Sequence, residues 1–179
     1  MGIDEAGRGA LSGPLVVAGV IYRKGNVVEE ARDSKLLTPK ERRALYFEIL
    51  KKAERIAISI VPPSIIDKVN IYNATLYGIK QLFSSKLLPD YLLIDALIVK
   101  DIVLPQIKLI KGERRSVSIA SASIVAKVTR DTIMERLHKF YPDYMWEKNK
   151  GYPTKDHIRA LQIKGLTPFH RRSYKPCQI

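Results

Sequence analysis

The sequence has 179 residues and a formal net charge of +13 at pH 7, from 31 Lys and Arg against 18 Asp and Glu. That length is typical of one compact domain, and a hydrophobic content of 46% is enough for a substantial core. The apolar runs are too short to span a bilayer, and the lone Cys177 excludes an internal disulfide. We therefore expect a soluble cytoplasmic protein with a polyanionic partner.

Short β-branched runs and segments with apolar residues at helical spacing are intermixed along the chain. The predicted strands are a short one before the glycine-rich turn at 7–13, followed by strands at 14–22, 55–61 and 91–99. The predicted helices are one after a cap at Thr38, one at 64–86 with a break near Asn70, one at about 116–140, and one from a cap at Thr154 to Gly165. This alternation predicts an α/β layered domain.

The last quarter of the chain is both basic and aromatic. From residue 136 onward there are ten Lys or Arg and three Asp or Glu, and seven of the Tyr, Trp and Phe residues fall in this part. Basic side chains can neutralise phosphates and flat rings can stack on bases or sugars, which favours nucleic acid over a membrane surface. Solvated lysines and core aromatics are the plainer interpretation.

Three acids stand where a plain core would not place them. Asp4 and Glu5 directly precede the glycine-rich turn, and they can serve one site only if the strand ends or bulges there, since adjacent strand residues face opposite sides. Asp95 lies within the apolar run 91–99, where a desolvated anion needs a compensating cation. The alternatives are a cap or turn role for Asp4 and a strand end for Asp95.

Asp131 falls on the predicted helix 116–140, one turn after Lys127, so an ordinary ion pair explains it when it is taken alone. Clustered carboxylates stay ionised together only around a metal or by sharing protons. All-oxygen ligands favour Mg²⁺ or Mn²⁺, and two such ions can activate water and stabilise the leaving oxygen of a phosphodiester. The acids and the basic surface together favour a nuclease.

Gly7, Gly9 and Gly13 also match a loose dinucleotide-binding pattern. That fingerprint needs a helix after the glycines, so that the helix N-terminus meets the pyrophosphate. Pro14 and a β-branched run follow here instead, so the pattern is disfavoured.

Seven motifs in the same order resemble ribonuclease HII, the type 2 ribonuclease H family. They are GIDEAGRG at 2–9, DSK at 33–35, NIYNAT at 70–75, LLIDAL at 92–97, SIASASIVAKVTRD at 118–131, KGYPTKDH at 150–157 and HRRSY at 170–174. The resemblance covers nearly the whole chain.

The resemblance implies a ribonuclease H-like fold, with a central mixed five-stranded sheet flanked by helices. It divides the chain into a catalytic domain at 1–140 and a small C-terminal helical extension at 141–179 that contributes to substrate binding. It also implies a metal-dependent endoribonuclease that uses two Mg²⁺ or Mn²⁺ ions, acts on the RNA strand of RNA/DNA hybrids and nicks 5′ to single ribonucleotides in duplex DNA. The products carry a 3′-hydroxyl and a 5′-phosphate, and we expect a monomer without membrane contact.

Residue by residue, the resemblance assigns the metal-binding carboxylates to Asp4, Glu5, Asp95 and Asp131. It places recognition of the ribose 2′-hydroxyl on the turn Gly7, Arg8 and Gly9, where a side chain would hold the backbone away from the sugar. Further implied contacts are stacking of Tyr152 on a deoxyribose and phosphate contacts by Lys35 and Lys127. Packing for Tyr152 and solvation for the two lysines are the alternatives.

Three positions depart from the family's common pattern: Glu113 stands for aspartate, Ser121 for alanine and Tyr174 for phenylalanine. We expect these to alter only local packing, and we expect no additional N-terminal substrate-binding domain of the type 3 kind. Two other functions remain open, a noncatalytic nucleic-acid-binding protein and another nuclease or recombinase of the same fold. Cleavage of an all-DNA duplex would distinguish the last of these.

Overall fold

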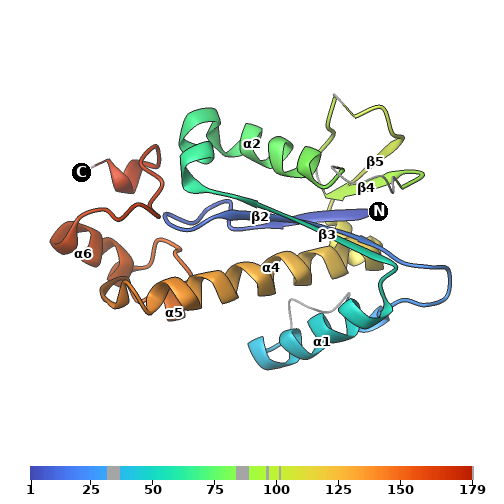
Figure 1. Ribbon diagram of the computed structural model, residues 1–179, viewed down its shortest axis with the longest axis horizontal. Coiled ribbons are helices and arrows are strands. Elements are labelled where there is room, and N and C mark those ends of the chain that lie inside the picture. Colours follow the sequence, from blue (N-terminus) through green and yellow to red (C-terminus); the bar gives the residue numbers. More distant parts are fainter. Residues whose placement is uncertain (32–36, 84–88, 96, 101, 179) are drawn as a thin grey trace.

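The structure is a computed structural model that describes residues 1–31, 37–83, 89–95, 97–100 and 102–178. A five-stranded sheet in the order β3-β2-β1-β4-β5 forms the middle layer between helices (Figure 1). β1 is antiparallel to β2 and parallel to β4, β2 is antiparallel to β3, and β4 is parallel to β5. The strands are β1 (Gly2–Ala6), β2 (Leu15–Ile21), β3 (Arg55–Val61), β4 (Leu92–Asp95) and β5 (Gln106–Leu109). The predicted mixed five-stranded sheet is confirmed.

Helices cover both faces of the sheet, with α2 on one side and α4 with α1 on the other (Figure 1). The helices are α1 (Pro39–Lys52), α2 (Pro63–Gln81), α3 (Gly112–Arg115), α4 (Val117–His138), α5 (Trp146–Asn149) and α6 (Lys155–Lys164). No helix in the described ranges has the length and apolar character that a membrane crossing requires.

Successive side chains of β2 point to opposite faces of the sheet, which decides which residues face which helices. Val17 packs into the cluster on the α2 side, whereas Val16 and Ala18 pack into the cluster on the α1 and α4 side. Both faces of β2 are buried, which explains why its sequence is a continuous apolar run.

α4 lies directly along β1. A Cβ atom on Gly2 would come within 2.3 Å of the Ser118 backbone, and a Cβ atom on Gly7 would come within 2.1 Å of the Arg130 side chain. The early part of α4 therefore lies beside the start of β1, and its later part lies beside the glycine-rich turn that follows β1.

The capping signals were reliable guides to the helices. Thr38 and Glu41 form the predicted capping box of α1, and Thr154 caps α6. Asn70 interrupts α2 with a φ of 67°, and its side chain accepts a hydrogen bond from the Asn73 amide. The predicted break in this helix is confirmed.

The region around Asp95 differs from the prediction. β4 ends at Asp95 instead of continuing to residue 99, and the sequence analysis did not anticipate β5 or α3. The Gln106 side chain binds both backbone groups of Val99: it accepts a hydrogen bond from the Val99 amide and donates one to the Val99 carbonyl. Val99 therefore lies in a loop, although it belongs to an apolar run of strand-forming residues. Asp95 thus stands at a strand end rather than in mid-strand.

The C-terminal part of the chain packs a cluster of its own around Trp146, which is fully buried. This cluster lies at the end of α4, with α5 and α6 around it (Figure 1). The division of the chain at residue 140 stays a prediction.

Candidate active site

Asp4 and Asp95 occupy matching positions on neighbouring parallel strands. Ile3 pairs with Ile94, and the two acids are the next residues of β1 and β4. Adjacent strands lie about 4.8 Å apart and residues at one register position face the same side, so the two carboxylates share the face covered by α3 and α4. Asp4 accepts a hydrogen bond from Ser123 of α4, and Asp95 Oδ1 accepts one from the Gly112 amide of α3 at 2.8 Å.

Glu5 completes this group from the other side of the strand. β1 remains regularly paired with β2 as far as Ala6, so there is no bulge, and Glu5 pairs with Val17 of the α2 side. Its carboxylate accepts a hydrogen bond from Arg8 Nη1 at 3.3 Å. Glu5 therefore lies near the end of the strand, which is one of the two alternatives, a strand end or a bulge, that the sequence left open.

The charges of the three acids act on one another. Burial, followed by the charge of Glu5 and then that of Asp95, raises the pKa of Asp4 to about 7, against opposing hydrogen bonds from Ser123 and the Glu5 amide. Burial also raises the pKa of Glu5, with Arg8 acting in the opposite direction and Asp95 adding to the rise. A divalent cation at this site would favour the ionised forms of both groups.

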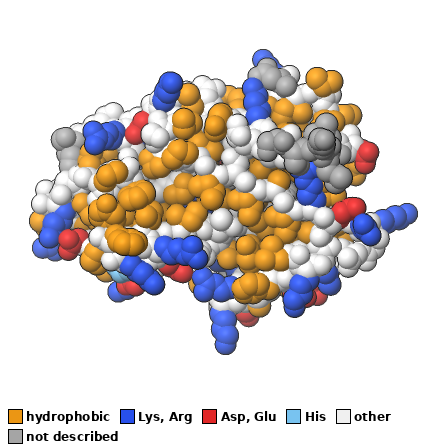
Figure 2. Space-filling model, in the orientation of Figure 1, with side chains coloured by type: hydrophobic (Ala, Val, Ile, Leu, Met, Phe, Trp, Pro, Cys, Tyr) orange, Lys and Arg blue, Asp and Glu red, His pale blue; other side chains and the backbone are white. Residues whose placement is uncertain are grey.

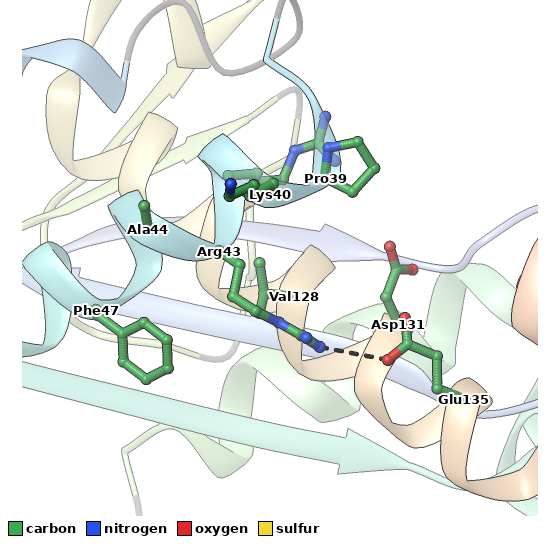
Figure 3. A pocket seen from close by; sticks show the side chains of 9 residues that line it. Pro39, Lys40, Arg43, Ala44, Phe47, Val128, Asp131 and Glu135 are labelled. Atoms are coloured by element: carbon green, nitrogen blue, oxygen red, sulfur yellow. Dashed lines mark hydrogen bonds and ion pairs between the residues drawn. The ribbon is translucent and has the colours of Figure 1, made fainter.

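Asp131 is not brought into this group. It lies eight residues after Ser123 on α4, a separation of about 12 Å along a helix. Its Oδ1 accepts a hydrogen bond from Lys127 Nζ at 2.7 Å, so the ion pair suggested as the alternative is present. Figure 3 shows Asp131 and Glu135 on one side of a groove between α4 and α1, with Lys40 and Arg43 across it. The assignment of Asp131 as the fourth ligand stays a prediction that this geometry does not favour.

Glu113 is an acid whose position the sequence analysis undervalued. It directly follows Gly112, whose amide binds Asp95, and only 6% of it is exposed. Glutamates are almost never fully buried unless they are paired. The signal was available, since Glu113 stands in the motif KGE, but we interpreted it as a change in packing.

The donor set suits a hard divalent ion. Asp4, Glu5 and Asp95 offer carboxylate oxygens, the ligands that Mg²⁺ and Mn²⁺ prefer. In the part of the chain that the structure describes, no group of three or more His, Cys, Asp or Glu side chains is arranged to hold a metal ion. Asp4, Glu5 and Asp95 fit such an ion by their chemistry and by the effect of their charges on one another.

The glycine-rich turn and Tyr152 lie side by side, as their proposed joint role requires. The Gly151 carbonyl accepts a hydrogen bond from the Leu11 amide at 2.8 Å. The Tyr152 ring packs against the Arg130 guanidinium at 5.3 Å and against Lys127 Nζ at 5.7 Å, measured to its centroid. Lys127 therefore contacts both Tyr152 and Asp131, whereas Lys35 lies outside the described residues.

Two buried arginines hold this turn, and the sequence analysis singled out neither. Arg130 donates to the carbonyls of Ser12, Pro14 and Lys150 at 2.8 to 3.0 Å. Arg171 donates to the carbonyls of Arg8 and Gly13 at 2.9 to 3.2 Å. Burial lowers the pKa of Arg130 to about 10, still well above neutral pH, so its guanidinium stays charged. Both residues stood inside quoted motifs, but a side chain that binds backbone carbonyls leaves no pattern in sequence.

The outer surface is rich in basic side chains. On the face shown in Figure 2, Lys and Arg project along the rim and gather at the lower edge, on the side where α1 and α5 lie in Figure 1. Such a surface suits a partner that carries many phosphates.

Comparisons with known proteins agree on one family. The family model for ribonuclease HII matches residues 1–177. Ribonuclease HII of Ligilactobacillus salivarius is 47% identical over 98% of this chain and 69% of its own length, and that of Caldanaerobacter subterraneus is 49% identical over 97% and 72%.

The solved structures show the same architecture. The crystal structure of ribonuclease H2 from Pyrococcus horikoshii has a TM-score of 0.81 and 27% identity, and covers 99% of this chain and 94% of that one. A structure of Bst-RNase HIII in complex with Mn²⁺ has a TM-score of 0.73 and 17% identity, covers 99% of this chain and 67% of that one, and bears on the fold alone. With an acidic strand pair beside a glycine-rich turn in a ribonuclease H-like fold, the chain belongs to the ribonuclease HII family of hydrolytic nucleases.

Proposed function

We propose that this protein is a metal-dependent endoribonuclease that cleaves RNA/DNA hybrids and nicks duplex DNA on the 5′ side of a single embedded ribonucleotide, leaving a 3′-hydroxyl and a 5′-phosphate. The observation that carries the proposal is the placement of Asp4 beside Asp95 on parallel strands, where burial, followed by the charge of Glu5, raises the pKa of Asp4 to about 7. Carboxylates whose charges act on one another in this way would be stabilised by divalent cations.

Asp4, Glu5 and Asp95 are the residues that would hold two Mg²⁺ or Mn²⁺ ions. We include Glu113 as the candidate fourth carboxylate, because it adjoins the Asp95 contact, and keep Asp131 as the rival for that place. Bound divalent ions supply activation of water and stabilisation of the leaving oxygen. The acids orient them, and the hydrogen bonds from Gly112 and Ser123 orient the acids.

Substrate selection is the proposed role of the glycine-rich turn and Tyr152. A Cβ atom on Gly9 would meet no protein atom within 4 Å, so nothing in the described part of the chain itself requires glycine there. A close approach of the ribose to the turn supplies the reason. Tyr152, adjacent through Gly151, would stack on the next sugar, and Lys127 would contact a phosphate nearby.

A duplex carrying one ribonucleotide, incubated with and without Mg²⁺, tests the proposal. We expect a single nick 5′ to the ribonucleotide that requires the metal, cleavage of an RNA/DNA hybrid, and an intact all-DNA duplex. Asp95→Asn should abolish cleavage while leaving duplex binding nearly unchanged, because the basic surface remains. Absence of metal-dependent cleavage would refute the proposal, and cutting of all-DNA duplex would favour a different nuclease of this fold.

The proposal also includes a monomeric enzyme that works in the cytoplasm. Sedimentation of the protein alone and with a short duplex should give masses of one chain and of one chain with one duplex. A stable dimer at the concentrations used in the cleavage assay would contradict the proposal that the enzyme is a monomer.

A further inference from the structure

We propose that Arg171 and Tyr174 are positioning residues that aim the Gly9 amide at the substrate, an inference that rests on the proposed function of the glycine-rich turn. Both residues belong to the C-terminal segment, at least 158 residues away from the turn in sequence. Neither is assigned a contact with substrate. Their role would be to fix the direction of one peptide group.

The Arg171 guanidinium joins the two ends of the turn. Its Nε and Nη2 atoms donate to the Gly13 carbonyl at 3.2 and 3.0 Å, and its Nη1 atom donates to the Arg8 carbonyl at 2.9 Å. The side chain is fully buried. Because a guanidinium is planar and rigid, it holds both carbonyls in one fixed relationship.

Tyr174 adds a second donor to the same carbonyl. Its hydroxyl donates to the Arg8 carbonyl at 2.6 Å and accepts a hydrogen bond from Arg171 Nη1 at 3.1 Å. Its ring also packs on the guanidinium, with 5.2 Å between ring centroid and Cζ. The Arg8 carbonyl is thus held from two directions, which fixes its orientation as well as its position.

Orientation of this carbonyl determines where the Gly9 amide points. The Arg8 carbonyl and the Gly9 N–H belong to one planar trans peptide unit, in which the two groups point in opposite directions. Since the carbonyl is directed inward to Arg171 and Tyr174, the N–H is directed away from them, and a Cβ atom on Gly9 would meet no protein atom within 4 Å. Among the described residues, none provides a recorded acceptor for this amide.

The segment that carries Arg171 and Tyr174 is itself anchored to the body of the protein. Asp67 of α2 accepts hydrogen bonds from the Arg172 amide at 3.0 Å and from the Ser173 amide at 2.9 Å. The Arg171 amide donates to the Leu11 carbonyl at 2.8 Å. Arg171 and Tyr174 are therefore presented by a segment that is fixed on both sides, as a positioning role requires.

Tyr174→Phe is the sharpest test, since it keeps the ring and removes only the hydroxyl. On a duplex with one ribonucleotide we expect kcat to fall about fivefold, the effect of one lost hydrogen bond, with KM unchanged because the basic surface still binds the duplex. Hydrogen exchange of a peptide covering residues 7–13 should become faster. Arg171→Lys should also lower kcat without changing KM, and the fall in kcat should be larger.

Tyr144→Phe is the matched control. It removes a hydroxyl that donates to the Gly165 carbonyl at 2.9 Å, in the same part of the chain but away from the turn. The proposal is overturned if Tyr174→Phe retains wild-type kcat, whatever its exchange rate, or if Tyr144→Phe causes the same loss. A wild-type protein that cuts no ribonucleotide-containing duplex would instead contradict the proposed function. In that case the positioning role can still be tested, because unchanged hydrogen exchange at residues 7–13 in Tyr174→Phe would overturn it.

Discussion

The Nε2 atoms of His157 and His170 lie 3.1 Å apart inside the C-terminal cluster, and their surroundings define the protonation of both rings. Trp146 donates to His157 Nε2 at 3.2 Å, so that nitrogen is an acceptor and the His157 proton is on Nδ1, facing the Tyr152 carbonyl at 3.0 Å. His170 must then donate through Nε2, while its Nδ1 accepts from the Thr167 amide at 2.9 Å. Both rings are neutral, and an additional proton on either would remove an acceptor.

This pair predicts sensitivity to acid. Burial, and then the proximity of His157, lowers the pKa of His170 to about 4 from an ordinary 6.5. Between these values the unfolded chain binds a proton that the folded chain does not, so the stability contributed by His170 is present at pH 7 and declines as the pH falls through this window. Urea unfolding should therefore show that the stability difference between wild type and His170→Asn narrows from pH 7 to pH 4.5. A constant difference would contradict the prediction.

Asp4 predicts the opposite dependence of the unfolding free energy on pH. Its folded pKa of about 7 lies above the ordinary 3.8, so the folded chain holds the additional proton between these values and the unfolding free energy declines as the pH rises. Without divalent ions, Asp4→Asn should be more stable than wild type at pH 8, by roughly 2–4 kcal/mol, and nearly equal to it at pH 4. The same variant should be inactive. Equal stability at pH 8 would show that Asp4 is not under electrostatic strain.

Gly7 and Gly9 of the turn should respond differently to substitution by alanine. Gly9→Ala meets no atom within 4 Å, so its melting temperature should equal that of wild type, while cleavage at a ribonucleotide falls about tenfold or more because the sugar is displaced. Gly7→Ala would clash with Arg130 at 2.1 Å and has a φ of +99°, so it should lose roughly 2–4 kcal/mol of stability. Full activity in Gly9→Ala would remove the turn from substrate recognition.

The identity of the fourth carboxylate can be decided by isosteric substitutions. Glu113→Gln should lower kcat about 100-fold, whereas Asp131→Asn, whose partner is Lys127, should lower it less than about tenfold. Glu135→Gln serves as the control, since it changes an acid of the α1–α4 groove that pairs with Arg43 and Lys150. A greater loss in Asp131→Asn would restore the assignment made from the resemblance.

Local chemistry explains which parts of the fold were predictable. The capping box of α1, the kink at Asn70 and the continuous apolar run of β2 are each determined by residues close together in sequence, so they could be recognised there. β4 was predicted too long because Gln106, a residue outside the run, captures the backbone of Val99. A long-range side-chain contact of that kind overrides strand propensity without leaving a periodic signal.

The candidate site divides in the same way. Asp4, Glu5 and Asp95 could be identified because a charge in an apolar context is conspicuous in sequence. The position of Asp131 relative to the other acids could not be predicted. Helical spacing shows that it pairs with Lys127, but it does not show which part of the fold that face of the helix lies against. Arg130 and Arg171 escaped notice because their partners are main-chain carbonyls, which every residue possesses.

The hydrogen bonds between the glycine-rich turn and the segment around Arg171 have a consequence for biosynthesis. The first strand and its turn emerge from the ribosome long before the residues that hold the turn in place, because Ser12 pairs with His170 and Arg8 with Arg171. A nascent chain can therefore build most of its sheet while Arg130 of α4, but not yet Arg171, holds the turn. The hydrogen bonds from Arg171 to the Arg8 and Gly13 carbonyls would form only after the segment around Arg171 has left the ribosome.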